Sequence, residues 1–268
     1  MPDPPSDLLA LALERVIGLG GLVWNLCITG ALPEARVEAL LRHEDQEVAF
    51  QAAVGEWHAD PSGSVRLGLR AAWREAALRS TGPLPDPFYR ADGSFARDWL
   101  AARYAEGPAT FLHERHDMEA AYAALDASQR ADLLALLPDR HWAGDAVQRL
   151  VGDDLALYRA LLSDERLRVH HRRPLRGRPD AAWAGKAVLA LEAGYSAAEV
   201  AEAGPSLGSG WPACRRTRWT EWLAHYEALD GHADRRLREV ARAGREAGRE
   251  RLARMARDDR REDSYEDE

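Results

Sequence analysis

One stretch of the sequence gathers residue types that could hold a metal or move protons. HERHDME, residues 113–119, contains two histidines and three carboxylates, and His116 or Asp117 would share a helix face with His113. This spacing supplies two ligands, whereas a metal site needs a third and a fourth, and the HExxH spacing is not met. We therefore expect a charged helix surface, and keep an enzyme that uses His113, His116 and Asp117 as a third alternative.

A second stretch matches a catalytic turn but lies in the wrong context. GPSLG, residues 204–208, fits the G-x-S-x-G pattern, in which a strand enters the turn and a helix leaves it. The preceding SAAEVAEA has a helical pattern, so we interpret Ser206 as part of an interhelix loop. The GLGG run at 18–21 also lacks the strand that leads into a phosphate loop. We expect no catalytic residue, no metal and no cofactor.

Arginines form the strongest electrostatic feature of the sequence. Six lie in DERLRVHHRRPLRGR, residues 164–178, and three lie in CRRTRW, residues 214–219, between two tryptophans. Guanidinium groups match phosphate oxygens, and bases stack on aromatic rings. The competing interpretation is pairing within the chain or contact with an acidic partner, because 44 acids accompany 36 basic residues. The candidate contacts are Arg166, Arg168, Arg172, Arg173, Arg176, Arg178, Arg215, Arg216 and Arg218.

A tryptophan-rich stripe gives a further candidate surface. Trp219 and Trp222 follow helical spacing with Leu223 and Tyr226, and such a stripe usually belongs to a core. Any exposed member would anchor a partner, since large aromatic side chains dominate interface energetics. Trp211, Trp219 and Trp222 are the candidate partner anchors.

Composition narrows the class of protein. The 268 residues are 46% hydrophobic and 30% charged, which argues against a disordered chain, and the net charge of -8 argues against a general polyanion binder. Cys27 and Cys214 lie far apart, so neither a disulfide framework nor a zinc site is indicated, and we expect a reducing cytoplasm. The uncharged run 16–32 follows several acids and contains glycines, so we expect buried helices there, without membrane contact. Lys186 is the one lysine among 36 basic residues, and this preference for arginine suggests a GC-rich bacterial genome.

Apolar residues recur at three and four positions with no sustained alternation, which predicts an all-α fold without substantial β-sheet. We expect helices at 65–80, 94–106, 109–125, 128–137, 142–151, 153–162 and 181–193. Three prolines and two glycines make 81–93 a connector between an N-terminal lobe, 1–80, and a second lobe, 94–257. The last helix should end near Arg257 and leave 258–268 as a disordered acidic tail.

One phrase occurs twice: residues 38–55 and 227–244 are identical at seven of eighteen positions. His43 or His232 should end one helix, and Asp45 or Asp234 should cap the next. The pattern L-x-x-H-x-D-x-x-[VL]-x-x-x-A resembles units of HEAT and armadillo-like repeats, α-helical solenoids in which each helix pair buries its apolar stripe on its neighbours. The resemblance covers 34–57 and 221–248, and it implies an irregular HEAT-like fold.

These observations predict a non-enzymatic scaffold or adaptor that serves a larger bacterial cytoplasmic assembly through a protein partner. The alternative is a nucleic-acid-binding accessory protein, for example of a phage-defence system, that uses the Arg-rich segments 166–178 and 215–218.

Overall fold

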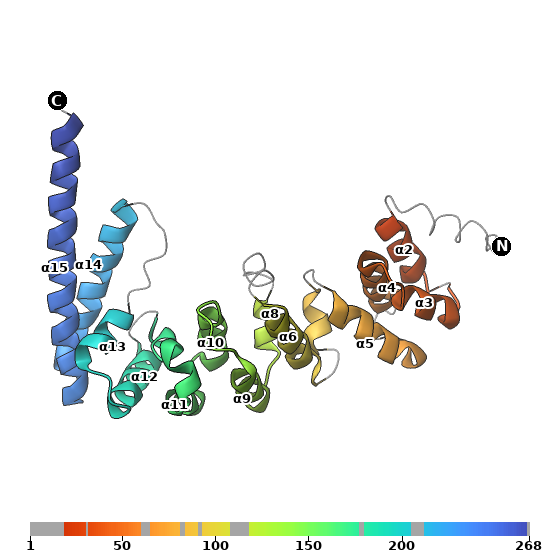
Figure 1. Ribbon diagram of the computed structural model, residues 1–268, viewed down its shortest axis with the longest axis horizontal. Coiled ribbons are helices and arrows are strands. Elements are labelled where there is room, and N and C mark those ends of the chain that lie inside the picture. Colours follow the sequence, from red (N-terminus) through yellow and green to blue (C-terminus); the bar gives the residue numbers. More distant parts are fainter. Residues whose placement is uncertain are drawn as a thin grey trace. The chain divides into compact units, whose positions relative to one another are not determined.

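The computed structural model describes residues 19–30, 32–59, 65–80, 84–90, 93–107, 118–176, 180–204 and 212–266 (Figure 1). These residues form α-helices, short 3₁₀-helices (η) and turns without any strand, so the predicted all-α fold class is confirmed. Packing divides the chain into two compact units, residues 1–129 and 130–268. The connector at 81–93, part of which lies outside the described residues, stays a prediction.

The first unit is a succession of short helices. They are α2 (Leu19–Ile28), α3 (Glu34–Leu41), α4 (Gln46–Ala59), η1 (Leu67–Leu69), α5 (Arg70–Arg79), η2 (Asp86–Arg90), α6 (Phe95–Glu106), α8 (Glu119–Ala123) and α9 (Ala127–Leu136), which runs past residue 129. Aromatic rings fill its core. The Trp57 and Trp73 ring centroids lie 5.5 Å apart, and each lies 5.0 Å from Phe88. The indole N–H of Trp73 donates to the Ala53 carbonyl at 3.0 Å, so this buried polar group is satisfied.

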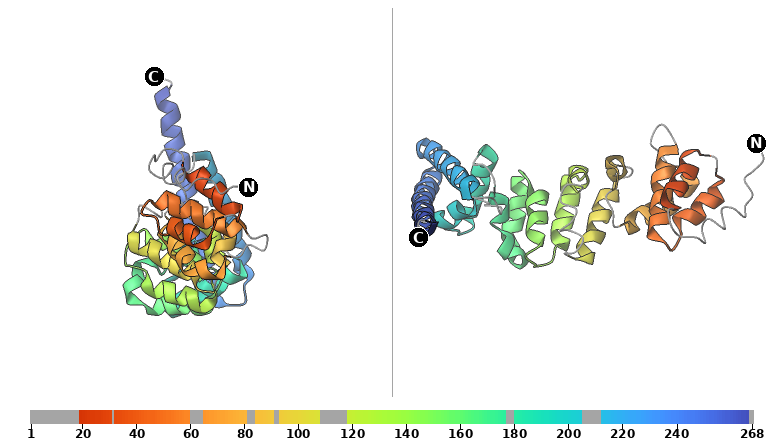
Figure 2. Two further views of the ribbon diagram at one scale, coloured as in Figure 1. Left: turned by 90° about the vertical axis from the view of Figure 1, so that its right-hand side faces the viewer. Right: turned by 90° about the horizontal axis from the view of Figure 1, so that it is seen from above.

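In the second unit, helices follow one another until two long helices pack side by side (Figures 1 and 2). The elements are α10 (Ala143–Val151), α11 (Leu155–Ser163), η3 (Glu165–His170), η4 (Arg173–Leu175), α12 (Ala181–Glu192), α13 (Ala197–Ala203), α14 (Pro212–Ala228), η5 (Leu229–Gly231) and α15 (Arg235–Glu266). Two buried polar side chains of this unit donate to backbone carbonyls. Trp183 Nε1 donates to the Leu175 carbonyl at 2.9 Å, and Tyr226 Oη donates to the Ala201 carbonyl at 2.6 Å.

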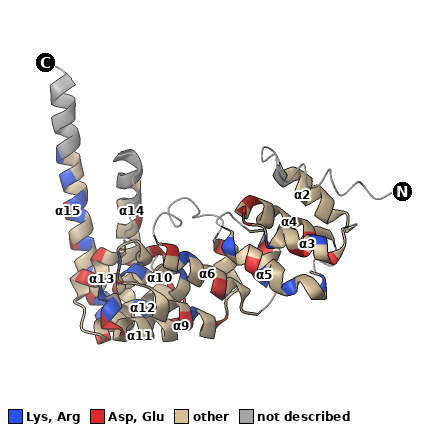
Figure 3. Cartoon of the chain, turned by 45° about the vertical axis from the view of Figure 1, so that its right-hand side comes forward, with Lys and Arg blue, Asp and Glu red and all other residues tan. Residues whose placement is uncertain are grey.

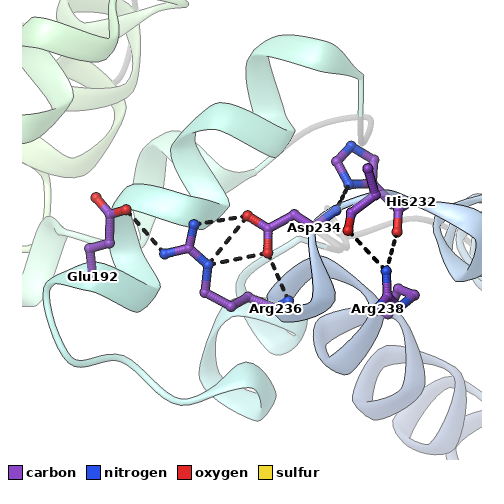
Figure 4. A network of polar contacts seen from close by, with 6 residues as sticks. Glu192, His232, Asp234, Arg236 and Arg238 are labelled. Carbon is purple, nitrogen blue, oxygen red and sulfur yellow. Dashed lines mark hydrogen bonds and ion pairs between the residues drawn. The ribbon is translucent and has the colours of Figure 1, made fainter.

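The repeated phrase forms the same helix junction in both units. The backbone N–H of Asp45 donates to His43 Nδ1 at 3.0 Å, and that of Asp234 donates to His232 Nδ1 at 3.1 Å (Figure 4). In each case the aspartate Oδ1 accepts from the N–H two residues later, at 2.8 Å. The predicted turn and cap are therefore confirmed. We call this arrangement the H-x-D junction.

The small residues of the repeat lie at close helix contacts in both copies. Ala52 and Ala241 are fully buried, and the glycine that ends each copy allows a neighbouring helix to approach. A Cβ at Gly55 would lie 2.6 Å from the Cys27 Cβ on α2, and one at Gly244 would lie 2.5 Å from the Tyr226 ring on α14. Each junction is thus followed, three turns later, by a point of close helix packing.

Most predicted helices match observed ones, and one boundary is wrong. The helices expected at 94–106, 128–137, 142–151, 153–162 and 181–193 are α6, α9, α10, α11 and α12, whereas most of 109–125 lies outside the described residues. The last helix does not end near Arg257, because α15 continues to Glu266. The segment 258–266 contains neither proline nor glycine, so nothing in it stops a helix that is already propagating.

The uncharged run at 16–32 is described from Leu19, where α2 begins. Across the described ranges, every helix is too short or too polar to cross a bilayer.

Candidate functional site

Arg166, the first of the candidate arginines, is held within its own unit. Its Nη1 donates to the Leu137 carbonyl and its Nη2 to the Ala135 carbonyl, both at 3.2 Å, and Nη2 also pairs with Asp164 at 2.7 Å. The last carbonyls of a helix lack intrahelical donors, and the C-terminal end of α9 obtains them from this guanidinium. Arg166 therefore has a structural role.

Arg168 and Arg172 point to the α12–α13 junction. Arg168 donates to Glu165 at 3.1 Å, a hydrogen bond that raises the pKa of Arg168. Both members of this pair are exposed, so it adds little stability. Arg172 is exposed and makes no hydrogen bond or ion pair with the described residues, although its charge acts on Tyr195 and on Glu199. Arg172 is therefore accessible to a ligand.

The two adjacent histidines have different surroundings. His171 is buried, and its Nε2 lies 3.0 Å from the Asp164 carbonyl, which can only accept, so Nε2 carries the proton. In the neutral ring, Nδ1 then accepts from the Tyr195 hydroxyl at 2.9 Å. His170 is also buried, but neither of its ring nitrogens has a hydrogen-bond partner in the described part of the chain. His171 is thus a satisfied core histidine and His170 is not.

Arg173 and Arg176 are half-buried, and Arg173 lies close enough to His170 and to Arg176 for its charge to act on both. Neither guanidinium has a hydrogen bond or ion pair in the described residues, and the charge of Arg173 lowers the pKa of both His170 and Arg176, in each case after the larger effect of burial. Within the described residues, the segment therefore separates into paired arginines, 166 and 168, and arginines without a hydrogen bond or ion pair, 172, 173 and 176.

The remaining candidates are placed only in part. Trp211 and Arg178 lie outside the described residues, as do the side chains of Arg215, Arg216 and Arg218 on α14. Trp222 lies against Gly204, where an added Cβ would be 2.6 Å from its ring, and Trp219 faces Gly248 at 3.8 Å. Both tryptophans thus contact their own unit through one face, and a role as partner anchors stays a prediction.

An arginine-rich surface on α15 was not among the candidates. Residues 235–257 contain nine arginines and three glutamates, a charge excess that the sequence displays (Figure 3). Four of the arginines are tied down: Arg235 to Glu239, Arg236 to Asp234 and Glu192, Arg238 to backbone carbonyls of its own junction, and Arg245 to Asp230. Five are exposed without a partner in the described residues, and we call them the α15 arginine surface: Arg242, Arg249, Arg251, Arg254 and Arg257.

The other chemically suggestive residues have structural surroundings or are not described. Burial raises the pKa of the Cys27 thiol to about 11, which leaves it unreactive. Lys186 is buried and donates to the Gly152 carbonyl at 3.0 Å, closing the end of α10. Residues 113–117 and Ser206 lie outside the described ranges, and in those ranges no cluster of His, Cys, Asp and Glu could hold a metal ion.

Comparisons with known protein families, with curated proteins and with solved structures give no match to this chain. The HEAT-like resemblance therefore stays a prediction that depends on the repeated phrase alone.

Proposed function

We propose that this protein is a non-enzymatic scaffold or adaptor that joins a larger bacterial cytoplasmic assembly by binding an acidic segment of a partner protein. The observation that carries the proposal is the α15 arginine surface. The arginines of this surface are exposed and have no partner in the described part of the chain, whereas the small and apolar residues of the same helix pack within the unit: Leu237, Val240, Ala241, Gly244 and Gly248. Arg242 and Arg249 are seven residues apart, so they lie on one side of the helix, about 10 Å from each other.

Charge complementarity supports the choice of partner. Residues 235–257 carry nine positive and three negative side chains in a chain whose net charge is -8, so this surface opposes the rest of the protein in sign. A basic row on an acidic protein attracts an acidic segment and repels a second copy bound through the same row. The repeated H-x-D junction adds support by analogy, since stacked helix pairs often present binding surfaces.

Affinity capture from a native lysate tests this proposal. The tagged full-length protein is treated with nuclease, washed at low and at high salt, and compared with R242E/R249E and with R36E/R159E. The control changes two exposed arginines on α3 and α11 that likewise lack partners among the described residues. We expect a stoichiometric protein that R242E/R249E loses and R36E/R159E keeps. Equal recovery by all three proteins would contradict the proposal.

A second candidate function is nucleic-acid binding, as in an accessory protein of a phage-defence system. Exposed Arg172 favours it, because this guanidinium lacks a partner in the described residues and is free to meet a phosphate. Affinity for an oligonucleotide should then fall steeply with salt, and Arg172→Ala should reduce that slope by about one.

A further inference from the structure

Three basic residues lie in the segment between α11 and α12. His170 ends η3, Arg173 begins η4, and Arg176 follows η4, so the three are spaced by three residues. Both η3 and η4 pack on α10, and the Gln148 side chain of α10 donates to the Arg176 carbonyl at 3.4 Å. The row of basic groups therefore lies alongside α10.

Arg173 contacts the beginning of α10 directly. A Cβ at Gly144, the second residue of the helix, would lie 2.5 Å from Arg173 Nε and 2.9 Å from its Cζ. The guanidinium thus rests on the first turn of a helix, where the macrodipole is positive. The N–H groups of Ala143 and Gly144 donate to the Arg140 and His141 carbonyls, and the N-cap residue, Trp142, makes no side-chain cap. Positive charge is brought to a positive helix end.

Two acids act on this arrangement, and one of them, Asp145, stands in the first turn of α10. Asp145 acts on Arg176 and Asp139 acts on His170 through their charges, but neither forms an ion pair with Arg173 or Arg176. A half-buried guanidinium without a counter-ion is unfavourable, and two that repel each other are more so. An anion between the two guanidinium groups would offset their repulsion.

His170 gives an independent sign that a ligand is missing. It is 1% exposed, and neither ring nitrogen has a hydrogen-bond partner in the described residues, although the Arg140 backbone lies near enough to favour the protonated ring. Buried polar atoms without partners are rare in proteins and commonly mark an absent water, ion or ligand. An anion between the arginines would favour the protonated ring, whose N–H groups can reach the Arg140 backbone.

The geometry points to a phosphoryl-binding site formed by Arg173, Arg176 and the first turn of α10, with His170 behind them. Guanidinium forks match the oxygens of a tetrahedral oxoanion, and the positive end of the helix macrodipole favours an anion beside it. The ligand would be inorganic phosphate or the phosphate of a nucleotide or nucleic-acid strand. This inference does not depend on the proposed scaffold function, since it uses none of the α15 arginines.

Calorimetric titration of the full-length protein tests the site. The ligands are inorganic phosphate, sulfate, a 5′-mononucleotide and a single-stranded oligonucleotide, and the variants are Arg173→Gln and Arg176→Gln. The control, Arg168→Gln, changes an exposed arginine of the same segment that pairs with Glu165. We expect each site variant to weaken binding at least about tenfold and the control to leave it unchanged. The ranking of the four ligands identifies the source of the phosphoryl group.

Two further measurements keep the test decisive. The Gly144→Ala variant keeps every charge but inserts a methyl group where Arg173 lies, so it should also weaken binding. Nitrogen chemical shifts of the His170 ring should change when sulfate is added, because sulfate keeps its charge over the working pH range. If none of the four ligands binds, or if binding survives in Arg173→Gln and Gly144→Ala, the site does not exist.

Discussion

The two H-x-D junctions have the same turn, but a different ion pair connects the helices beside each turn. We call these ion pairs the braces of the junctions. In the first unit, the carboxylate of Glu56 on α4 accepts hydrogen bonds from Arg66 Nε at 2.8 Å and from Arg66 Nη2 at 2.7 Å. Arg66 Nη1 donates to the carbonyl of Leu32, just before α3, at 3.1 Å. Glu56 is only 1% exposed. In the second unit, Arg236 joins Asp234 at 2.8 Å and Glu192 on α12 at 3.0 Å, at the surface (Figure 4).

This difference shows which features are encoded locally. The turn depends on His and Asp two residues apart, so each copy of the phrase forms it again. The braces join residues ten and forty-four positions apart. The repeated phrase contains Arg236 but neither Glu56 nor Arg66, and the residue of the first copy that corresponds to Arg236 is Glu47. Repetition therefore conserves the turn, and each unit adds its own brace.

Removing the buried brace should have the largest effect. Arg66→Met leaves the buried Glu56 carboxylate without its partner, which typically costs about 3–5 kcal/mol of unfolding free energy. Urea denaturation followed by tryptophan fluorescence measures this loss, and hydrogen exchange should locate it in α3 and α4.

The matched control is Glu56→Gln combined with Arg66→Met, which removes the buried charge and should recover part of the loss. If Arg66→Met alone costs less than about 1 kcal/mol, the buried brace contributes no more than a surface pair, and the contrast between the junctions disappears.

The glycine that follows the second junction should give the next largest effect. Gly244→Ala places a methyl group 2.5 Å from the Tyr226 ring, which cannot retreat because its hydroxyl donates to Ala201. We expect a loss of about 1–3 kcal/mol. Gly21→Ala is the control: it lies in α2 with nothing within 4 Å, so the higher helix propensity of alanine should stabilise it by about 0.5–1 kcal/mol. Thermal denaturation should show a lower melting temperature for Gly244→Ala and a higher one for Gly21→Ala. An unchanged melting temperature in Gly244→Ala would refute the close packing.

The sequence predicted the features that depend on near neighbours. Periodicity indicated the all-α fold, and the H-x-D spacing indicated both junctions. The sequence did not reveal that Arg166 donates to the carbonyls of Ala135 and Leu137, because those acceptors lie about thirty residues away along the chain. The many acids of the sequence are alternative partners for every arginine. The row of His170, Arg173 and Arg176 was visible as a spacing of three, yet its meaning depends on α10, which only the fold brings beside it.

The aspartate cap of the H-x-D junction should contribute less to the free energy of unfolding. Asp45→Ala removes the acceptor for the N–H groups of Glu47 and Val48, and the loss of such a cap typically costs about 1 kcal/mol. Asp45→Asn keeps an acceptor oxygen and should recover most of that loss. The exchange rate of the Glu47 amide reports the effect directly, and a rate that does not change in Asp45→Ala would show that the cap does not hold the turn.

The smallest effect should be the response of the second junction to acid. The side chain of Arg236 donates to Asp234, as does its backbone N–H, and the two bonds lower the pKa of Asp234 in the folded protein. The stabilisation is therefore complete above the unfolded pKa and is lost as the pH falls through the lowered folded value. Carbon NMR of the Asp234 carboxyl group should show a pKa below the ordinary range, and Arg236→Gln should raise it.

Added salt should also raise this pKa, because the pair is exposed to solvent. If the Asp234 carboxyl group has its ordinary pKa in the wild-type protein, or the same pKa in Arg236→Gln, the surface brace does not stabilise the junction. In that case the second junction would depend on its turn and on the packing of Gly244, and the two junctions would differ by the presence of one brace rather than by its kind.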